Sequence, residues 1–262
     1  MFPHLFASLC ILTLVLNVMV VEAAKIAVVD FADEWTKVDA LRQTLDAFKV
    51  EYDDLTKALE GGKLPLKAET KIFLIGSMLT NNPILHQNLD KNAKTIQDFV
   101  ENGGLVWEPT QADQNEANVD WLPPGLSCVR SDRDSPVFEI LQADHPLFNE
   151  PNRMDQKTFE GWKHQGWPTV WEVISSQKGF DVLMESLGEP VIMEAEFGKG
   201  KFLMMAIAPD KYHIAGNDNN TKDMAKLFME NLLFHVEEFA AIEADGKLTT
   251  MWANLKMWSM RY

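Results

Sequence analysis

The strongest constraint on the fold is an alternation of short apolar runs with segments of helical periodicity. The apolar runs lie at residues 25–30, 50–55, 71–76 and 105–107. Continuous apolar runs of this length are typical of strands that are buried on both faces of a parallel sheet. Strands that alternate with helices along the chain predict a parallel sheet with helices packed on both faces.

Segments with helical periodicity lie between these predicted strands. Before the second strand, a helix is predicted from apolar residues at helical spacing, which are Trp35, Val38, Leu41, Leu45 and Phe48. A second helix is predicted to start at Asn82-Pro83, because Asn caps helix N-termini and Pro is tolerated at the first helical position. It is predicted to run as one helix to Asn102-Gly103-Gly104, where glycine suits a left-handed C-terminal cap.

The second half of the chain has a different pattern. Residues 109–169 are rich in Pro, Asp, Asn and Gly, which predicts a long, loop-rich segment with short helices. Further strands are predicted at residues 170–174, 180–185, 190–197 and 201–207. The short turns between them favour antiparallel pairing. A last amphipathic helix, over about 222–239, is expected to cover the sheet.

The predicted fold class is therefore α/β. We expect a flavodoxin-like, three-layer α/β/α domain over residues 24–239, with a mostly parallel sheet and an antiparallel extension. The tail, residues 240–262, has apolar residues at mixed helical spacing and predicts a short docking helix. This helix could dock on its own domain or on a partner.

Residues 1–23 have the pattern of a secretory signal peptide. An apolar run leads to Val21-Glu22-Ala23, in which Val21 and Ala23 are the short apolar residues that signal peptidase needs. The alternative is an uncleaved membrane anchor, because the run is near the lower length limit of a spanning helix. We predict a secreted or periplasmic protein that contacts a membrane only if this segment is retained.

Charge and cysteine content exclude several classes of partner and cross-link. The formal net charge of -15 argues against binding to nucleic acid or anionic lipid, because both would repel the chain. Cleavage after residue 23 would leave Cys128 without a second cysteine, so no internal disulfide is expected. We interpret Cys128 as a half-buried structural thiol.

Three short motifs carry a resemblance to a known family. They are Phe99-Val-Glu-Asn-Gly-Gly-Leu-Val106, His145-Pro-Leu-Phe148 and the segment from Gly198-Lys-Gly-Lys201 to Ala208-Pro-Asp210. With the opening strand–helix units, they make the chain resemble the class I glutamine amidotransferase-like superfamily, and within it the ThuA-like (trehalose-utilisation) branch. The resemblance spans most of residues 25–239 and implies a fold more firmly than an activity.

The chain departs from this family where the family's chemistry resides. Working glutamine amidotransferases carry a nucleophilic Cys in a Gly-x-Cys-x-Gly elbow after a strand, and a His in a His-Pro-Glu step. Here the corresponding strand ends Val-Trp-Glu-Pro-Thr at residues 106–110, without a cysteine. The second step reads Ala208-Pro209-Asp210, so the acid is kept in kind but the histidine is absent. The resemblance therefore implies a fold without glutaminase activity.

Polar side chains are expected at the carboxyl ends of the parallel strands, where open sheets bind ligands. The candidates for catalysis are Asp30, Ser77, Glu108, Asp210 and His213. Their carboxylates could bind a divalent cation or act as an acid–base pair. The alternative is that they cap helix N-termini, where the helix dipole favours negative charge.

Aromatic and histidine residues give weaker indications. The tryptophans Trp121, Trp162, Trp167 and Trp171 lie in or beside the loop-rich segment and could stack on sugar rings or form an interface, the alternative being core packing. No His-Glu-x-x-His or paired-Cys spacing is present. We therefore expect no metal site and no cofactor.

These observations predict a non-catalytic domain that binds a small ligand, with carbohydrate-related ligands one option, or a protein partner. An alternative is a hydrolase or isomerase that uses the carboxylates at the strand ends. A third option is a structural module that assembles with itself or another secreted protein.

Overall fold

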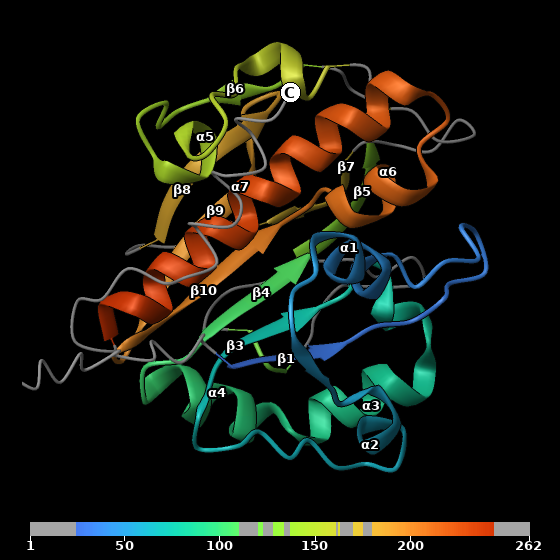
Figure 1. The fold of residues 1–262 in the computed structure, drawn as a ribbon, viewed down its shortest axis with the longest axis vertical. Helices are drawn as coiled ribbons and strands as arrows, with labels where there is room; N and C mark the ends of the chain where they lie inside the picture. Colours follow the sequence, from blue (N-terminus) through green and yellow to red (C-terminus); the bar gives the residue numbers. More distant parts are fainter. Residues whose placement is uncertain are drawn as a thin grey trace, which may run out of the picture.

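The computed structural model describes residues 25–109, 120–122, 128–133, 137–160, 162, 170–174 and 180–243. The predicted signal peptide and most of the predicted docking tail lie outside these residues. One eight-stranded sheet forms the centre of the molecule, and helices cover both of its faces (Figure 1). The predicted three-layer α/β class is confirmed.

Five parallel strands form one half of this sheet. In spatial order they are β2 (Tyr52–Asp54), β1 (Lys25–Val29), β3 (Thr70–Ile75), β4 (Leu105–Pro109) and β10 (Gly200–Met205). This is the flavodoxin-like order, in which the direction of winding reverses between β1 and β3. The crevice outside the carboxyl ends of β1 and β3 is therefore the place where such sheets bind ligands.

Antiparallel strands extend the sheet beyond β10. They are β9 (Glu189–Phe197), β8 (Phe180–Ser186) and β6 (Glu139–Ile140). The hairpin between β9 and β10 turns at Gly198, whose φ of 64° lies in the left-handed region that favours glycine. The predicted antiparallel extension is confirmed, with one exception.

The exception is the predicted strand at residues 170–174. This segment forms β7 (Val170–Ile174), but it pairs with β5 (Cys128–Arg133) in a separate two-stranded sheet. The loop-rich segment therefore contributes two strands, β5 and β6, that the sequence pattern did not indicate. It also holds the short helices α5 (Pro146–Asn149) and η2 (Gln156–Thr158).

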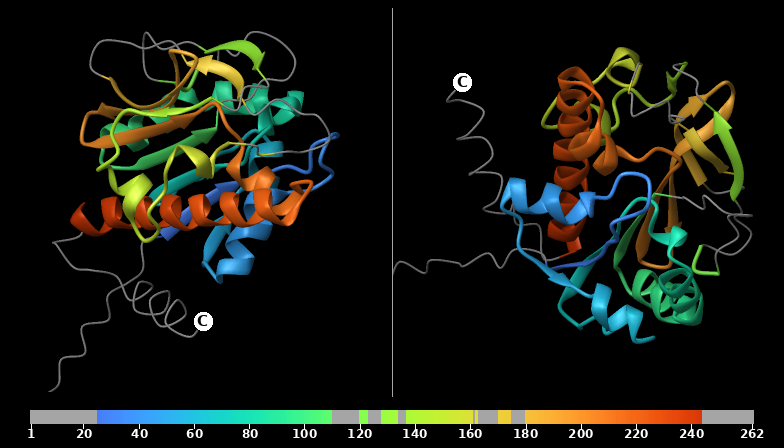
Figure 2. Two further views of the ribbon diagram at one scale, coloured as in Figure 1. Left: turned by 90° about the horizontal axis from the view of Figure 1, so that it is seen from above. Right: turned by 90° about the vertical axis from the view of Figure 1, so that its right-hand side faces the viewer.

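The helices divide between the two faces of the sheet (Figure 2). One face carries α1 (Ala40–Phe48), α6 (Pro209–Ala215) and α7 (Asn219–Glu243). The other carries α2 (Thr56–Glu60), α3 (Pro83–Lys91) and α4 (Ala93–Glu101), with η1 (Leu79–Asn81) leading into α3. Among the described residues, no helix combines the length and the apolar character needed to cross a membrane.

Two helix predictions are corrected by the structure. Trp35 does not begin the first helix: α1 begins at Ala40, and Trp35 lies in the preceding loop with 47% of its surface exposed. The helix predicted from residue 82 to 102 is two helices, α3 and α4, separated at Asn92. The Asn92 side chain donates to the Asn88 carbonyl (2.7 Å), a local bond that competes with the helical pattern. The predicted cap at Asn82 is confirmed, because its Oδ1 accepts from the backbone N–H of Ile84 and Leu85.

Candidate functional site

The reversal point of the sheet brings three predicted candidates together. Asp30 follows β1, Ser77 follows β3, and Asp210 lies in the first turn of α6. All three side chains are fully buried, and the Ser77 backbone N–H donates to Asp210 Oδ2 (3.1 Å). Gly76 packs directly against Asp30: a Cβ at this position would lie 2.1 Å from Asp30 Oδ1. Only glycine allows this approach.

The Asp30 carboxylate also caps a helix. Its Oδ1 accepts from the backbone N–H of Phe31 (2.8 Å), and its Oδ2 accepts from that of Arg42 (3.0 Å) in the first turn of α1. Burial raises the pKa of Asp30 to about 7; the charge of Lys211 lowers it, and that of Asp210 raises it. The capping alternative weighed for this residue is therefore what the structure shows.

Lys211 is the central cation of this region, and the sequence interpretation did not select it. Only 1% of its surface is exposed, and its Nζ lies 3.0 Å from Asp33 Oδ2. The same ammonium donates to the carbonyls of Phe31 (3.1 Å) and Val38 (2.7 Å). Lys211 therefore holds the segment between β1 and α1 against α6. We call Asp30, Asp33, Ser77, Asp210 and Lys211 the switch-point cluster.

The two other acids of this cluster respond in opposite ways to their surroundings. Burial raises the pKa of Asp210 despite the nearby Lys211 and Ser77. Burial acts in the same direction on Asp33, but the Lys211 charge and hydrogen bonds from Thr36 outweigh it and lower the pKa. Within the described part of the chain, Ser77 Oγ and Asp210 Oδ1 make no hydrogen bond. Buried polar atoms without a partner are uncommon in proteins.

Glu108 and His213, the other two candidates, are engaged elsewhere. Glu108 is buried in β4 and accepts from Trp121 Nε1 (3.1 Å), and burial raises its pKa to about 7. His213 lies on α6, stacks on Phe48 with 5.8 Å between ring centroids, and has a pKa lowered by burial. Neither residue makes a hydrogen bond or ion pair with the switch-point cluster in the described structure.

The predicted tryptophan surface is corrected at two positions. Trp121 and Trp162 are buried, so neither offers an exposed ring face to a sugar or a partner. Trp162 instead packs among the rings of Phe159, Tyr212 and Phe228, as the core-packing alternative expects. Trp167 lies outside the described residues. Trp171 is in β7, and its side chain is likewise outside the described part.

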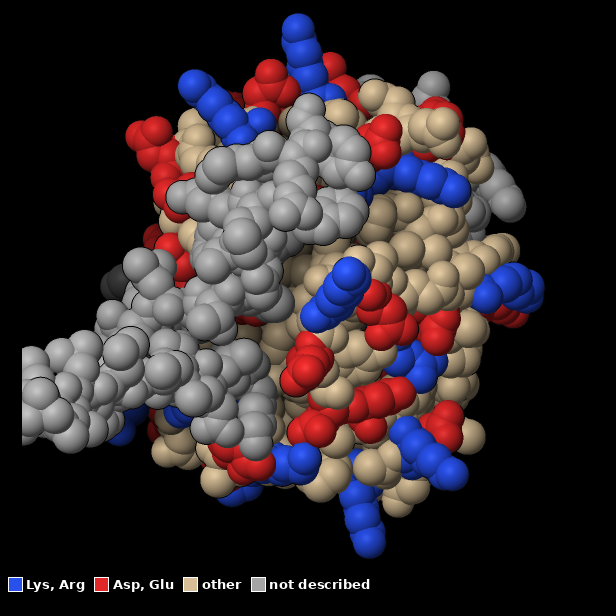
Figure 3. All heavy atoms as spheres, in the orientation of Figure 1, with Lys and Arg blue, Asp and Glu red and all other residues tan. Residues whose placement is uncertain are grey.

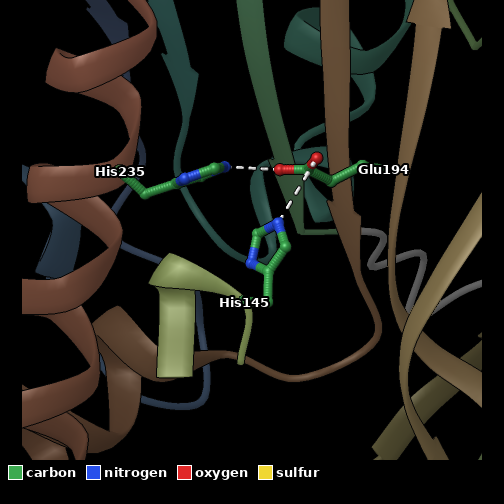
Figure 4. Close-up of side chains that lie close together, drawn as sticks. All are labelled: His145, Glu194 and His235. Carbon is green, nitrogen blue, oxygen red and sulfur yellow. Dashed lines mark hydrogen bonds and ion pairs between the residues drawn. The ribbon is translucent and has the colours of Figure 1, made fainter. Parts of the chain in front are cut away.

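A second polar cluster lies in the antiparallel half of the sheet. Glu194 on β9 points between His235 of α7 and His145, which directly precedes α5 (Figure 4). His235 Nε2 hydrogen bonds to Glu194 Oε1, and His145 Nε2 lies 3.6 Å from Glu194 Oε2. Lys201 Nζ of β10 donates to the same Oε2. We call His145, Glu194, Lys201 and His235 the β9 cluster.

The β9 cluster keeps its carboxylate ionised. Burial alone would raise the pKa of Glu194. The neighbouring His145, the hydrogen bond from His235 and the charges of His235 and Lys201 outweigh burial and hold this pKa well below its usual range. The residues come from widely separated segments, so no sequence spacing could have indicated the cluster. The one signal was Glu194 itself, an acid in the middle of the strand predicted at residues 190–197.

On the face shown in Figure 3, the acidic side chains do not form a single negative patch. Acidic and basic side chains are interspersed there, with polar and apolar residues between them. Several exposed carboxylates have a cation beside them, for example Asp53 with Lys67 and Asp98 with Lys94. Exposed pairs of this kind contribute little to stability.

Comparison with known proteins supports the fold. No family model matches the chain, and no curated protein matches it by sequence. Among solved structures, a cytoplasmic protein from Salmonella typhimurium LT2 is similar with a TM-score of 0.53 and 16% identity, over 81% of this chain and 99% of that one. A glutamine amidotransferase from Thermotoga maritima is similar with a TM-score of 0.52 and 12% identity, over 83% of this chain and 99% of that one. At these identities the likeness establishes a class I glutamine amidotransferase-like fold and nothing about activity.

Proposed function

We propose that this chain, which has a class I glutamine amidotransferase-like fold, is a non-catalytic domain that binds a small ligand or a protein partner outside the cytoplasm. The observation that carries the proposal is the use made of the carboxylates at the strand ends. Asp30 caps α1, Asp33 pairs with Lys211, and Glu108 accepts from Trp121. Each of these carboxylates is thus bound by a backbone or side-chain group of the protein itself.

The replacement of residues that glutamine hydrolysis needs supports the same conclusion. The chain has Ala208 and Asp210 where the family has a His-Pro-Glu step, and β4 ends at Pro109 with no cysteine in it. Asp210 is fully buried and accepts from the Ser77 backbone N–H. Without a thiolate and a base, acyl transfer has no nucleophile. The His145-Pro146-Leu147-Phe148 step favours the ThuA-like branch of this superfamily.

Trp35 is our candidate for the binding contact. It lies in the loop between β1 and α1, beside the reversal point of the sheet, and 47% of its surface is exposed. Lys211 fixes both ends of this loop through the carbonyls of Phe31 and Val38. A partly exposed indole on an anchored loop suits stacking on a sugar ring or insertion into an apolar partner surface.

The first test is an ammonia-release assay with glutamine on the full chain, with a working glutamine amidotransferase as the positive control. We expect release at the level of the blank. Turnover that persists after repurification and is lost in Asp210→Asn would contradict the proposal.

The second test measures ligand binding through the shift in thermal unfolding midpoint across a panel of neutral mono- and disaccharides. Trp35→Ala and Leu187→Ala are compared; Leu187 is also exposed, but it lies in the turn between β8 and β9. We expect any sugar that stabilises the parent to lose its effect in Trp35→Ala and to keep it in Leu187→Ala. A shift that survives in Trp35→Ala would place the site elsewhere.

A hydrolase or isomerase remains the second candidate, and one observation favours it. Asp30 and Asp210 both have raised pKa values in one cluster, beside the buried hydroxyl of Ser77. Perturbed carboxylates often mark functional sites. Hydrolysis of a chromogenic ester or glycoside that falls to background in both Ser77→Ala and Asp210→Asn would support this candidate over the binding domain.

A further inference from the structure

We propose that His145, Glu194 and His235 form a binding site for a zinc ion. The three residues come from the start of α5, from β9 and from α7, and their ligand atoms all lie within 4.8 Å of one another. The site is separate from the switch-point cluster. It depends neither on the ligand proposed above nor on the absence of glutaminase activity.

The donor set and its spacing suit zinc. Two imidazoles and one carboxylate form the set used where zinc keeps a fourth position open for water or substrate. Zinc bonds to nitrogen and oxygen of about 2.0–2.2 Å place neighbouring tetrahedral ligands about 3.3–3.6 Å apart. The 3.6 Å between His145 Nε2 and Glu194 Oε2 matches this spacing without movement of the backbone. The hydrogen bond between His235 and Glu194 has to lengthen to admit the ion, and the three ligand atoms, which all lie within 4.8 Å of one another, have to close to this spacing.

Lys201 occupies the place of a cation in the metal-free protein. Its ammonium donates to Glu194 Oε2, so it neutralises the carboxylate to which zinc would bind. Its side chain is 21% exposed, which leaves it a path to solvent. Glu196, directly opposite Lys201 in the β9–β10 register and exposed, offers an alternative partner. Zinc binding therefore requires Lys201 to move from Glu194, and Lys201 competes with the metal.

His145 adds a second competing process. Its Nδ1 accepts from the Leu147 backbone N–H (3.2 Å) at the start of α5, which places the ring proton on Nε2. Binding of zinc at Nε2 moves that proton to Nδ1 and removes this capping bond. Zinc should therefore loosen the first turn of α5 while it joins α7 to β9.

The test is titration of the chelator-treated full chain with Zn²⁺, followed by isothermal calorimetry. We expect one ion per chain. Loss of a direct ligand should weaken binding by at least about 100-fold, more than the loss of a supporting partner does. Glu194→Gln and His235→Gln should both show this loss. His86→Gln is the matched control, because His86 also lies beside a carboxylate, Asp90 (3.6 Å), on a different helix.

Lys201→Gln distinguishes a metal site from a purely structural network. Because the competing ammonium is removed, zinc should bind several-fold more tightly than to the parent. A structural network without metal affinity predicts no saturable binding in either protein.

The visible absorption of bound Co²⁺ provides a second readout, and circular dichroism identifies variants that fail to fold. If a variant fails to fold, His145→Gln, at the partly exposed edge of the site, replaces it. The proposal is overturned if folded Glu194→Gln binds zinc as the parent does. It is also overturned if His86→Gln, and not the ligand variants, abolishes binding.

Discussion

The two polar clusters of this protein both contain buried carboxylates, but they differ in the number of cations beside each carboxylate and in the resulting pKa values. In the switch-point cluster, the charge of one lysine acts on three carboxylates, and the pKa values of Asp30 and Asp210 are raised. In the β9 cluster, a lysine and two histidines surround one carboxylate, and the pKa of Glu194 is lowered. Burial is nearly complete for all three acids. The direct partners of each carboxylate, and not the depth of burial, therefore decide the direction of the shift. Asp33 of the switch-point cluster is equally buried, but it pairs directly with Lys211 and its pKa is lowered.

The two lysines differ in the same way. Lys211 is fully buried and is the cationic partner of Asp33 among the described residues. Lys201 is partly exposed, and Glu194 has a second partner, because it also accepts a hydrogen bond from His235. The first lysine should therefore be necessary for folding, and the second should be replaceable.

The largest effect is expected for Lys211→Met. Methionine keeps most of the volume, but it leaves Asp33 as a buried carboxylate without its cation. Removing one partner of a buried pair costs about 3–5 kcal/mol in the free energy of unfolding. Urea denaturation at pH 7 measures this, with Lys94→Met as the control, because Lys94 and Asp98 form an exposed pair that contributes little to stability. Equal losses in the two variants would contradict the central role of Lys211.

A pH-dependent effect is expected for Glu194→Gln. The folded-state pKa of Glu194 lies below its unfolded value, so its stabilisation is present above about pH 4.5 and is lost as the pH falls through the folded pKa. At pH 7 the variant should be less stable than the parent by about 2–4 kcal/mol. The difference should shrink steadily below pH 4.5. Urea midpoints at pH 7, 5 and 3 measure it, and a constant difference would show that Glu194 gains nothing from ionisation.

Glu108→Gln should show the opposite sign. The pKa of Glu108 is raised to about 7, so in the parent the protonated form contributes stability that is lost as the pH rises from about 4.5 through 7. Glutamine keeps an oxygen to accept from Trp121 Nε1 and carries no charge at any pH. The variant should match the parent near pH 4.5 and exceed it by up to about 3 kcal/mol at pH 8. Parallel pH profiles of the unfolding free energy would contradict the raised pKa.

The sequence predicted the switch-point cluster better than the β9 cluster for a physical reason. Parallel strands end at one edge of a sheet, so Asp30 and Ser77 could be placed together from the strand pattern alone. No such rule joins His145, Glu194 and His235, because they meet only through the packing of α7 and α5 on the antiparallel half.

The misplaced start of α1 has a related cause. Helical periodicity favoured a start at Trp35, but the contacts of Lys211 with Phe31, Asp33 and Val38 hold this segment in a loop. A tertiary contact from a residue far along the chain thus overrides local propensity. The buried tryptophans Trp121 and Trp162 give the same lesson, because their partners come from distant elements.

The smallest effect is expected for Lys201→Gln, and it tests the comparison of the two lysines most directly. Glu194 retains the hydrogen bond from His235, and the lost ammonium is partly exposed to solvent, which screens its charge. We expect a cost of about 0.5–1 kcal/mol in the free energy of unfolding at pH 7, measured by urea denaturation without added metal. A loss as large as that of Lys211→Met would mean that Lys201 is an essential counter-ion of Glu194. It would then not be a displaceable one, and the two clusters would depend on their lysines in the same way.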